Sequence, residues 1–239
     1  MIYSKANPIV KETIKLKQRK YRNKTGLFIV EGEHLVEEAY QANMIEYVFT
    51  NKDEDYKDCL TYFVDENILK LLSDVITPKP LIAVCKKVIN QGFGDNILLL
   101  DNIQDPGNIG TLIRSALAFG FKSIVAKNSV DFYNDKVIRS SQGALFRVGL
   151  FNDDLVEFIR NNDDYRYLAT DLNTDNYLEN IEVFEGKIAL ILGNEGMGVS
   201  QEVLNEVSER IKIRIKDVES LNVGVAGSII MYEIMKRQV

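Results

Sequence analysis

The sequence predicts an α/β protein with a parallel sheet. Residues 97–100 and 188–192 are continuous apolar runs, each short enough for a strand that is buried on both faces. Between such runs lie stretches with apolar residues at helical spacing, as at Ala226, Ile229, Ile230 and Ile234. Because strands and helices alternate along the chain, helices are expected to cover both faces of the sheet.

Length and composition set the broad class. At 239 residues, with ordinary composition, the chain is long enough for one or two domains that each bury a core. It contains no apolar run near the roughly 20 residues of a membrane helix, and its first residues lack an apolar signal segment, so we expect a cytoplasmic protein with no membrane partner. Cys59 and Cys85 have neither metal spacing nor a disulfide framework, and the lone His34 is expected to be a surface residue at a helix start.

Charge is unevenly distributed. The net charge is −6, yet residues 1–26 contain eight Lys and Arg against the single acid Glu12. A basic arm on an acidic body predicts a local contact with a polyanion. Asn7 and Pro8 favour a helix over residues 8–22 that carries these charges, either as a solvated face or as a phosphate-contacting one.

The first part of the chain is predicted to be a small α/β domain. Strands are expected at residues 27–30, 47–49, 60–64 and 81–85, with helices at 33–42 and 66–72 and a turn at Gly32. A polar stretch, residues 86–95, contains Asn90, Gln91 and Gly92 and predicts a linker. The expected domains are therefore residues 1–90 and 91–239.

The second domain is predicted to begin with the strand at 97–100. The helix after it buries an apolar stripe that includes Ile109, Leu112 and Ile113, and Arg114 lies about 140° from Ile109 at 100° per residue. Taken alone, such an arginine is a surface charge. A strand at 123–126, a segment at 135–140, a helix at 153–159 and a strand at 165–170 follow.

The last part of the chain has two strand-end loops that each lead into a helix. The strand at 188–192 ends in a loop with three glycines, Gly193, Gly196 and Gly198, before a helix at 201–207. A strand at 210–215 leads to residues 219–224 and the final helix. Loops at strand ends are where α/β sheets bind ligands. Neither the dinucleotide pattern GxGxxG nor a phosphate loop ending in Gly-Lys-Ser/Thr is present, which disfavours a nucleotide-binding enzyme.

Three motifs resemble those of one enzyme family. The strings DNIQDPGNIGTLIRSALAFG, GNEGMGVS and ESLNVGVA are similar to the three motifs of the SpoU (TrmH-like) branch of the SPOUT RNA methyltransferases. The resemblance implies a deep trefoil knot in the C-terminal domain, preceded by an RNA-binding domain similar to ribosomal protein L30e. It also implies a homodimer and methyl transfer from S-adenosylmethionine to a ribose 2′-hydroxyl of RNA, most often ribosomal RNA, without a metal.

The same resemblance implies roles for individual residues. Arg114, Asn108, Glu195, Ser220 and Asn222 are the expected catalytic residues. Cofactor contacts are expected from Leu192, Gly193, Asn194, Ile213, Leu221, Asn222 and Ala226. The charge of the basic arm, rather than the resemblance, predicts RNA contacts from Lys11, Lys15, Arg19, Lys20 and Arg22. One departure is Gly224, where many relatives have serine, so a second serine has no role here.

Two alternatives stay open at the level of sequence. One is a non-enzymatic RNA-binding or ribosome-assembly protein on the same scaffold, which the intact Asn108, Arg114, Glu195 and Asn222 disfavour. The other is a ribose methyltransferase that acts on transfer RNA. A protein that binds S-adenosylmethionine is expected to be an enzyme rather than the non-enzymatic alternative. Mapping of the methylated nucleotide shows whether the enzyme acts on ribosomal or transfer RNA.

Overall fold

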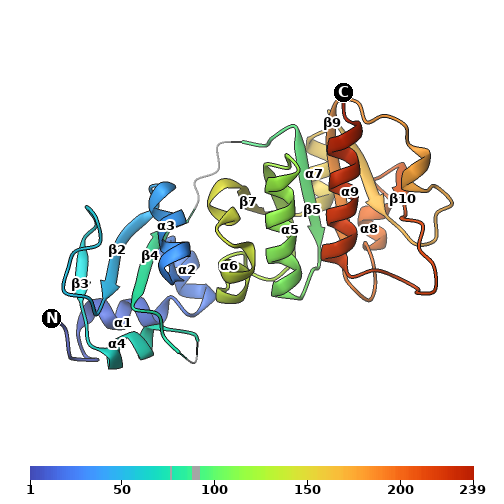
Figure 1. Cartoon of the computed structure of the whole chain (residues 1–239). Coiled ribbons are helices and arrows are strands. Elements are labelled where there is room, and N and C mark those ends of the chain that lie inside the picture. The colour runs from blue at the N-terminus through green and yellow to red at the C-terminus, as the bar shows by residue number, and fades with distance from the viewer. Residues whose placement is uncertain (76, 88–91) are drawn as a thin grey trace. The chain divides into compact units, whose positions relative to one another are not determined.

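The computed structural model describes residues 1–75, 77–87 and 92–239 of the chain. It contains two compact units (Figure 1). The first unit comprises Met1–Ile89 together with Tyr133–Phe146, and the second comprises Asn90–Phe132 and Arg147–Val239. The sequence did not predict that residues 133–146 pack with the first unit. The predicted linker residues Asn90 and Gln91 lie outside the described residues, and the division into functional domains at residue 90 stays a prediction.

The first unit is built on a four-stranded mixed sheet in the order β1-β4-β2-β3. The strands are β1 (Leu27–Glu31), β2 (Ile45–Thr50), β3 (Thr61–Phe63) and β4 (Leu81–Lys86). Strand β4 is antiparallel to β1 and β2, whereas β2 and β3 are parallel. These strands agree with the predicted runs within one or two residues at each end.

Helices cover this sheet. They are α1 (Pro8–Lys15), α2 (Arg19–Thr25), α3 (Glu33–Gln41), α4 (Glu66–Leu72) and α6 (Asp135–Ser141), the last followed by a 3-10 turn at Ala144–Arg147. Helices α1 and α4 pack together over a core that includes Val10, Phe49 and Leu72. From the later segment, the Tyr133 ring lies 4.7 Å from the ring of Phe28 on β1.

The prediction of one continuous helix at 8–22 is wrong. The chain forms two helices there, because it leaves the helical conformation between Lys15 and Arg19. Leu16 is buried there, and Gln18 adopts extended backbone angles (φ −101°, ψ 130°). Arg22 has a side chain that turns inward, donating to the backbone carbonyls of Leu16 and Lys17, both at 2.9 Å. A tertiary contact thus overrides the helical pattern of the sequence.

The second unit is built on a six-stranded sheet in which every pair is parallel, as predicted. Its order is β10-β8-β9-β5-β6-β7. The strands are β5 (Asn96–Asp101), β6 (Ser123–Lys127), β7 (Gly149–Asn152), β8 (Tyr165–Thr170), β9 (Lys187–Gly193) and β10 (Glu209–Ile211). From β5 the chain moves outward to β6 and β7 and then crosses to the other side of the sheet. The boundary between β5 and β9 is therefore the topological switch point, where α/β sheets bind ligands.

Helices lie on both faces of this sheet. On one face, α5 (Pro106–Ala118) and α9 (Val223–Arg237) pack side by side (Figure 1). On the other face, α7 (Leu155–Asn161) and α8 (Gln201–Leu204) share a core with Ile191. Leu192, the next residue of β9, lies under α9, which agrees with the alternation of side chains along a strand.

In the second unit, two boundaries and two short elements differ from the prediction. Strand β10 ends at Ile211 rather than at residue 215, and α8 ends at Leu204 rather than at residue 207. Strand β7 was not predicted, because only four residues form it at the sheet edge. A 3-10 turn at Leu178–Asn180 was also not foreseen. Within the described ranges, the structure contains no helix with the length and apolar character needed to span a membrane.

Replacing Arg22 by Met should lower the free energy of unfolding by about 1–3 kcal/mol, because it leaves two backbone carbonyls without their charged donor. Arg19→Met is the matched control, since Arg19 is exposed on the same helix, and it should change stability by less than about 0.5 kcal/mol. Denaturant unfolding of both full-length variants measures the difference. Equal stability of the two variants would show that the Arg22 contacts do not hold this segment.

Candidate active site

The candidate site lies where β5 and β9 end, at the switch point of the parallel sheet. Asp101, the last residue of β5, is in register with Gly193, the last residue of β9. Each strand leads into a polar loop, and the first of these loops leads into α5. Side chains from three distant stretches of the chain therefore meet at this edge.

Asn108 joins the three stretches. Its Nδ2 donates to Oε1 of Glu195 at 2.9 Å, and its Oδ1 accepts from Nδ2 of Asn222 at 2.9 Å. Helix α5 places Asn108 in its first turn, where Pro106 starts the helix and Asp105 caps it by accepting from the Asn108 backbone N–H at 3.0 Å. The described structure thus brings together three of the five expected catalytic residues.

Asn222 is also the N-cap of α9. Its Oδ1 accepts from the backbone N–H groups of Gly224 at 2.9 Å and Val225 at 3.3 Å. The amide oxygen of Asn222 therefore caps the last helix, while the amide nitrogen donates to Asn108. This double use fixes the position of the last helix relative to α5.

The loop after β9 is closed by its own hydrogen bonds. The backbones of Asn194 and Gly198 pair in both directions, at 3.0 and 2.9 Å. The Asn194 side chain accepts from the backbone N–H groups of Gly196 and Met197 and donates to the carbonyl of Asn102. Asn194 therefore shapes the loop that presents Glu195.

Two further residues hold this loop against the sheet. A Cβ on Gly193 would lie 2.0 Å from the backbone carbon of Gly198, so only glycine fits there. Asp101, which is buried, accepts from the backbone N–H of Ser200 at 2.7 Å. The sequence reasoning missed Asp101, although an acid that directly follows an apolar strand was a usable signal.

Two of the expected cofactor residues have unused backbone groups. Leu192 is buried, and Ile213, Leu221 and Ala226 are half-buried. In the described part of the chain, the backbone N–H and C=O of Ile213 and Leu221 make no hydrogen bond. Half-buried apolar side chains beside free backbone donors and acceptors fit an adenine ring, whose faces are apolar and whose edges are polar.

Asn108, Glu195 and Asn222 form what we call the Asn108 cluster. Arg114 and Ser220 are not part of it. Arg114 is exposed on α5, six residues after Asn108 and so about 9 Å further along the helix axis. Neither its guanidinium nor the Ser220 hydroxyl makes a hydrogen bond or ion pair with any residue that the structure describes. The side chain of Arg114 is thus available for contact with another molecule.

The basic residues of the first unit differ in exposure. Lys11, Arg19 and Lys20 are exposed, and Lys15 forms a hydrogen-bonded ion pair with Glu12 at 2.6 Å that raises the pKa of Lys15. Arg22 is the exception, with 6 % of its surface exposed. Because its guanidinium already serves two carbonyls, the expected RNA contact by Arg22 is corrected to a structural role.

Comparison with known families decides the assignment. The family model "SpoU rRNA Methylase family" matches residues 95–232, and the model "MRM3-like substrate binding domain" matches residues 7–83. The chain belongs to the SpoU rRNA methylase family. Residues 95–232 include all three motifs and every residue of the Asn108 cluster.

Relatives and solved structures agree with this membership. The 23S rRNA (guanosine(2553)-2'-O)-methyltransferase RlmP of Bacillus subtilis is 34% identical over 98% of both chains. The mitochondrial rRNA methyltransferase 3 of Xenopus laevis is 28% identical over 93% of this chain and 72% of its own length. Among solved structures, the AdoMet-bound rRNA methyltransferase from Sinorhizobium meliloti has a TM-score of 0.85 and 26% identity, covering 97% of this chain and 95% of that one.

Gly193→Ala should abolish cofactor binding, because the new methyl group overlaps the backbone of Gly198 and forces the loop open. It should also lower stability by about 1–3 kcal/mol, the usual cost of overpacking. Gly196→Ala is the control within the same loop, since a Cβ there lies 3.6 Å from its nearest neighbour, an ordinary contact. Calorimetric titration with S-adenosylmethionine measures both variants, and wild-type affinity in Gly193→Ala would contradict this role of the loop.

Proposed function

We propose that this protein transfers a methyl group from S-adenosylmethionine to a ribose 2′-hydroxyl of ribosomal RNA. The observation that carries the proposal is the Asn108 cluster, in which residues of all three motifs are joined by hydrogen bonds. The RlmP and mitochondrial relatives, which are named as rRNA methyltransferases, support ribosomal RNA as the substrate.

S-adenosylmethionine supplies an electrophilic methyl group on a positively charged sulfur when it is bound. The chain's own part is to hold that molecule with the backbones of Gly193, Ile213 and Leu221 and with the apolar side chains of Leu192 and Ala226. Rigid loops matter here because alignment of the reacting atoms supplies much of the rate acceleration in a direct transfer. The hydrogen bonds of Asn194 and Asp101 give the loop that rigidity.

Arg114 is the residue assigned to the ribose. A guanidinium keeps its proton at neutral pH, so it serves as a fixed cation rather than as a base. Placed at the 2′-oxygen and the neighbouring phosphate, it would stabilise the negative charge that develops as the hydroxyl loses its proton to a phosphate oxygen or to water. Ser220 is proposed to orient the ribose, and Glu195 is held beside the site by Asn108.

The first unit is proposed to bind the RNA. Lys11, Arg19 and Lys20 expose their charges on α1 and α2, and Lys15 lies on the same segment. Contacts of such residues with phosphates position RNA without reading its sequence. The match of residues 7–83 to a substrate-binding domain model supports this assignment.

The assembly is proposed to be a homodimer with a knotted C-terminal domain. Helix α9 exposes Val225, Ile229, Tyr232 and Met235, which recur every three or four residues and so form one apolar stripe. A second copy that covered this stripe would remove it from water. The domains are proposed at residues 1–90 and 91–239, and the free thiols of Cys59 and Cys85 suit a cytoplasmic protein.

Methyl transfer to ribosomal RNA is the direct test. The purified protein should transfer labelled methyl from S-adenosylmethionine to RNA from cells that lack this gene, and mapping should locate one 2′-O-methylated ribose. Arg114→Ala should lower the rate at least about 100-fold, as removal of a charge-stabilising donor does, with unchanged cofactor affinity. Arg114→Lys should recover only part of the rate, because lysine lacks the bidentate geometry.

The control for these variants is Arg160→Ala, which removes an exposed arginine on α7 that pairs with Glu206. It should leave the rate within about twofold of wild type. Methylation of transfer RNA but not of ribosomal RNA would move the substrate to the alternative class. Absence of S-adenosylmethionine binding would favour the non-enzymatic RNA-binding protein.

A further inference from the structure

The basic part of the first unit contains a single aromatic residue, Tyr21. We call residues 11–24 the basic segment, because they include seven Lys and Arg against the single acid Glu12. The segment spans most of α1, the turn after it and most of α2. An aromatic ring within such a cluster of charge is a possible second kind of contact beside the phosphate contacts already assigned.

Four of the seven basic side chains are free. They are exposed and have no acidic partner among the residues that the structure describes: Lys11, Arg19, Lys20 and Lys24. Lys15 and Lys17 form ion pairs, and Arg22 is turned inward. The four free charges give this surface a positive potential that attracts a polyanion.

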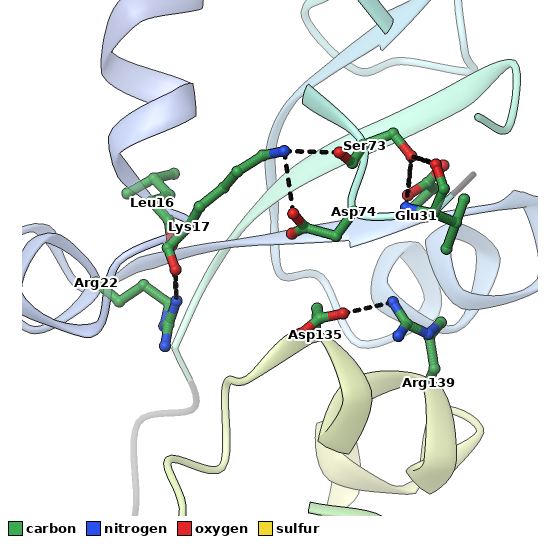
Figure 2. Close-up of polar contacts among 9 residues, drawn as sticks. Leu16, Lys17, Arg22, Glu31, Ser73, Asp74, Asp135 and Arg139 are labelled. Atoms are coloured by element: carbon green, nitrogen blue, oxygen red, sulfur yellow. Dashed lines mark hydrogen bonds and ion pairs between the residues drawn. The ribbon is translucent and has the colours of Figure 1, made fainter. Parts of the chain in front are cut away.

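The turn between α1 and α2 is held by side chains on both sides (Figure 2). Arg22 donates to the backbone carbonyls of Leu16 and Lys17. Nζ of Lys17 in turn donates to the carbonyl of Ser73 at 2.6 Å and lies 3.0 Å from Oδ1 of Asp74 (Figure 2). These bonds fix α2 against α1, so Tyr21 on α2 has a defined place beside the end of α1.

The ring of Tyr21 lies among the lysines of both helices. Nζ of Lys20 is 4.8 Å from the ring centre, and Nζ of Lys15, from α1, is 5.8 Å from it. Lys11 is four residues before Lys15 and therefore shares its face of α1, and Lys24 is three residues after Tyr21 on α2. The ring is thus placed between the free charges of the two helices.

Tyr21 is not committed to the core of the unit. The residue is half-buried, and among the described residues its hydroxyl has no hydrogen-bond partner and its ring contacts no other aromatic ring. Tyr62 shows the contrast, because it packs against the core and lies 5.6 Å from the ring of Phe49. The groups over the Tyr21 ring are lysine ammonium groups on flexible stems, which can move to phosphates and leave the ring to another flat molecule.

This arrangement fits single-stranded nucleic acid. Proteins bind such strands by stacking bases on aromatic side chains while Lys and Arg contact the phosphates. The bases of a duplex are already stacked on one another, so their faces cannot reach a side chain outside the helix. An acidic protein surface would match the charges but would leave the ring without a partner.

We propose that Tyr21 stacks on an unpaired nucleobase of the RNA substrate while Lys11, Lys20 and Lys24 contact the neighbouring phosphates. The inference rests on the proposed function, because it specifies how the first unit binds the same RNA. Every base has a flat face, so this contact selects unpaired over paired RNA without reading the sequence.

The test compares two fluorescein-labelled probes bound to the full-length protein at one salt concentration: a single strand of roughly ten nucleotides and a blunt RNA duplex of the same length. The variants are Tyr21→Leu and Tyr21→Phe. The matched control is Tyr40→Leu, since Tyr40 is also half-buried under a lysine, Lys57, at 3.9 Å. Lys57 is neutralised by Glu37, so Tyr40 lacks the free charges that surround Tyr21. No variant changes the net charge.

Tyr21→Leu should bind the single strand about tenfold more weakly than wild type, the effect of losing one stacked base, and should bind the duplex within about twofold of wild type. Tyr21→Phe and Tyr40→Leu should bind both probes as wild type does, because Tyr21→Phe keeps the ring and Tyr40→Leu leaves the basic segment intact. An equal loss on both probes would mean that Tyr21 only holds the two helices together. That result, wild-type affinity of Tyr21→Leu for the single strand, or no binding of the single strand by wild type would overturn the inference.

Photocrosslinking tests the same contact in the wild-type protein and so decides the question even if Tyr21→Leu does not fold. A single strand that contains 5-iodouridine should crosslink to Tyr21 under ultraviolet light, because this reaction is favoured when an aromatic ring stacks on the base. Crosslinks only at other residues would contradict the proposal. Methyl transfer by the wild type, measured in parallel, tests the proposed function separately: methylation without the Tyr21 contact refutes this inference alone, and the Tyr21 contact without methylation refutes the proposed function alone.

Discussion

The carboxamide of Asn108 is the contact on which the site depends. A side-chain amide can donate to a carboxylate and accept from another amide at the same time, and Asn108 does both toward Glu195 and Asn222. Its partners lie 87 and 114 residues further along the chain. Three motifs that are distant in sequence therefore become one site through two hydrogen bonds.

The parallel sheet explains why those motifs can meet. Strands β5 and β9 are neighbours in register although they are far apart in the chain, so the loops after Asp101 and Gly193 start at the same level. Helix α9 then packs against α5, where Gly227 leaves room for Leu112 and Leu192. A Cβ at Gly227 would lie about 2.5 Å from Leu192. Close helix packing thus brings the cap Asn222 to Asn108.

Much of the fold followed from the sequence. Continuous apolar runs predicted most strands of the parallel sheet, and Asn7 followed by Pro8 marked the start of the first helix. The predicted family and class of enzyme are confirmed by the match over residues 95–232 and by the relatives. The meeting of Asn108, Glu195 and Asn222 could be expected only through the resemblance, because local pattern carries no information on long-range contacts.

Other features had no usable local signal. The break between α1 and α2 depends on the burial of Leu16 and on the inward turn of Arg22, both tertiary effects. Strand β10 ends at Ile211 because its partner β8 ends at Thr170, and beyond it Lys212 pairs instead with the irregular segment at Tyr177, although the sequence there alternates as a strand would. Packing of Tyr133 on Phe28 places a late segment in the first unit, which no periodicity could indicate.

A double-mutant cycle tests the central role of Asn108 most directly. The binding free energy of S-adenosylmethionine would be measured by calorimetry for wild type, Asn108→Ala, Glu195→Ala and the double variant. If Asn108 acts by holding the Glu195 loop in place, the two losses overlap and the coupling energy is about 1 kcal/mol or more. Losses that add to within about 0.3 kcal/mol would mean that the two residues act independently and would contradict this account.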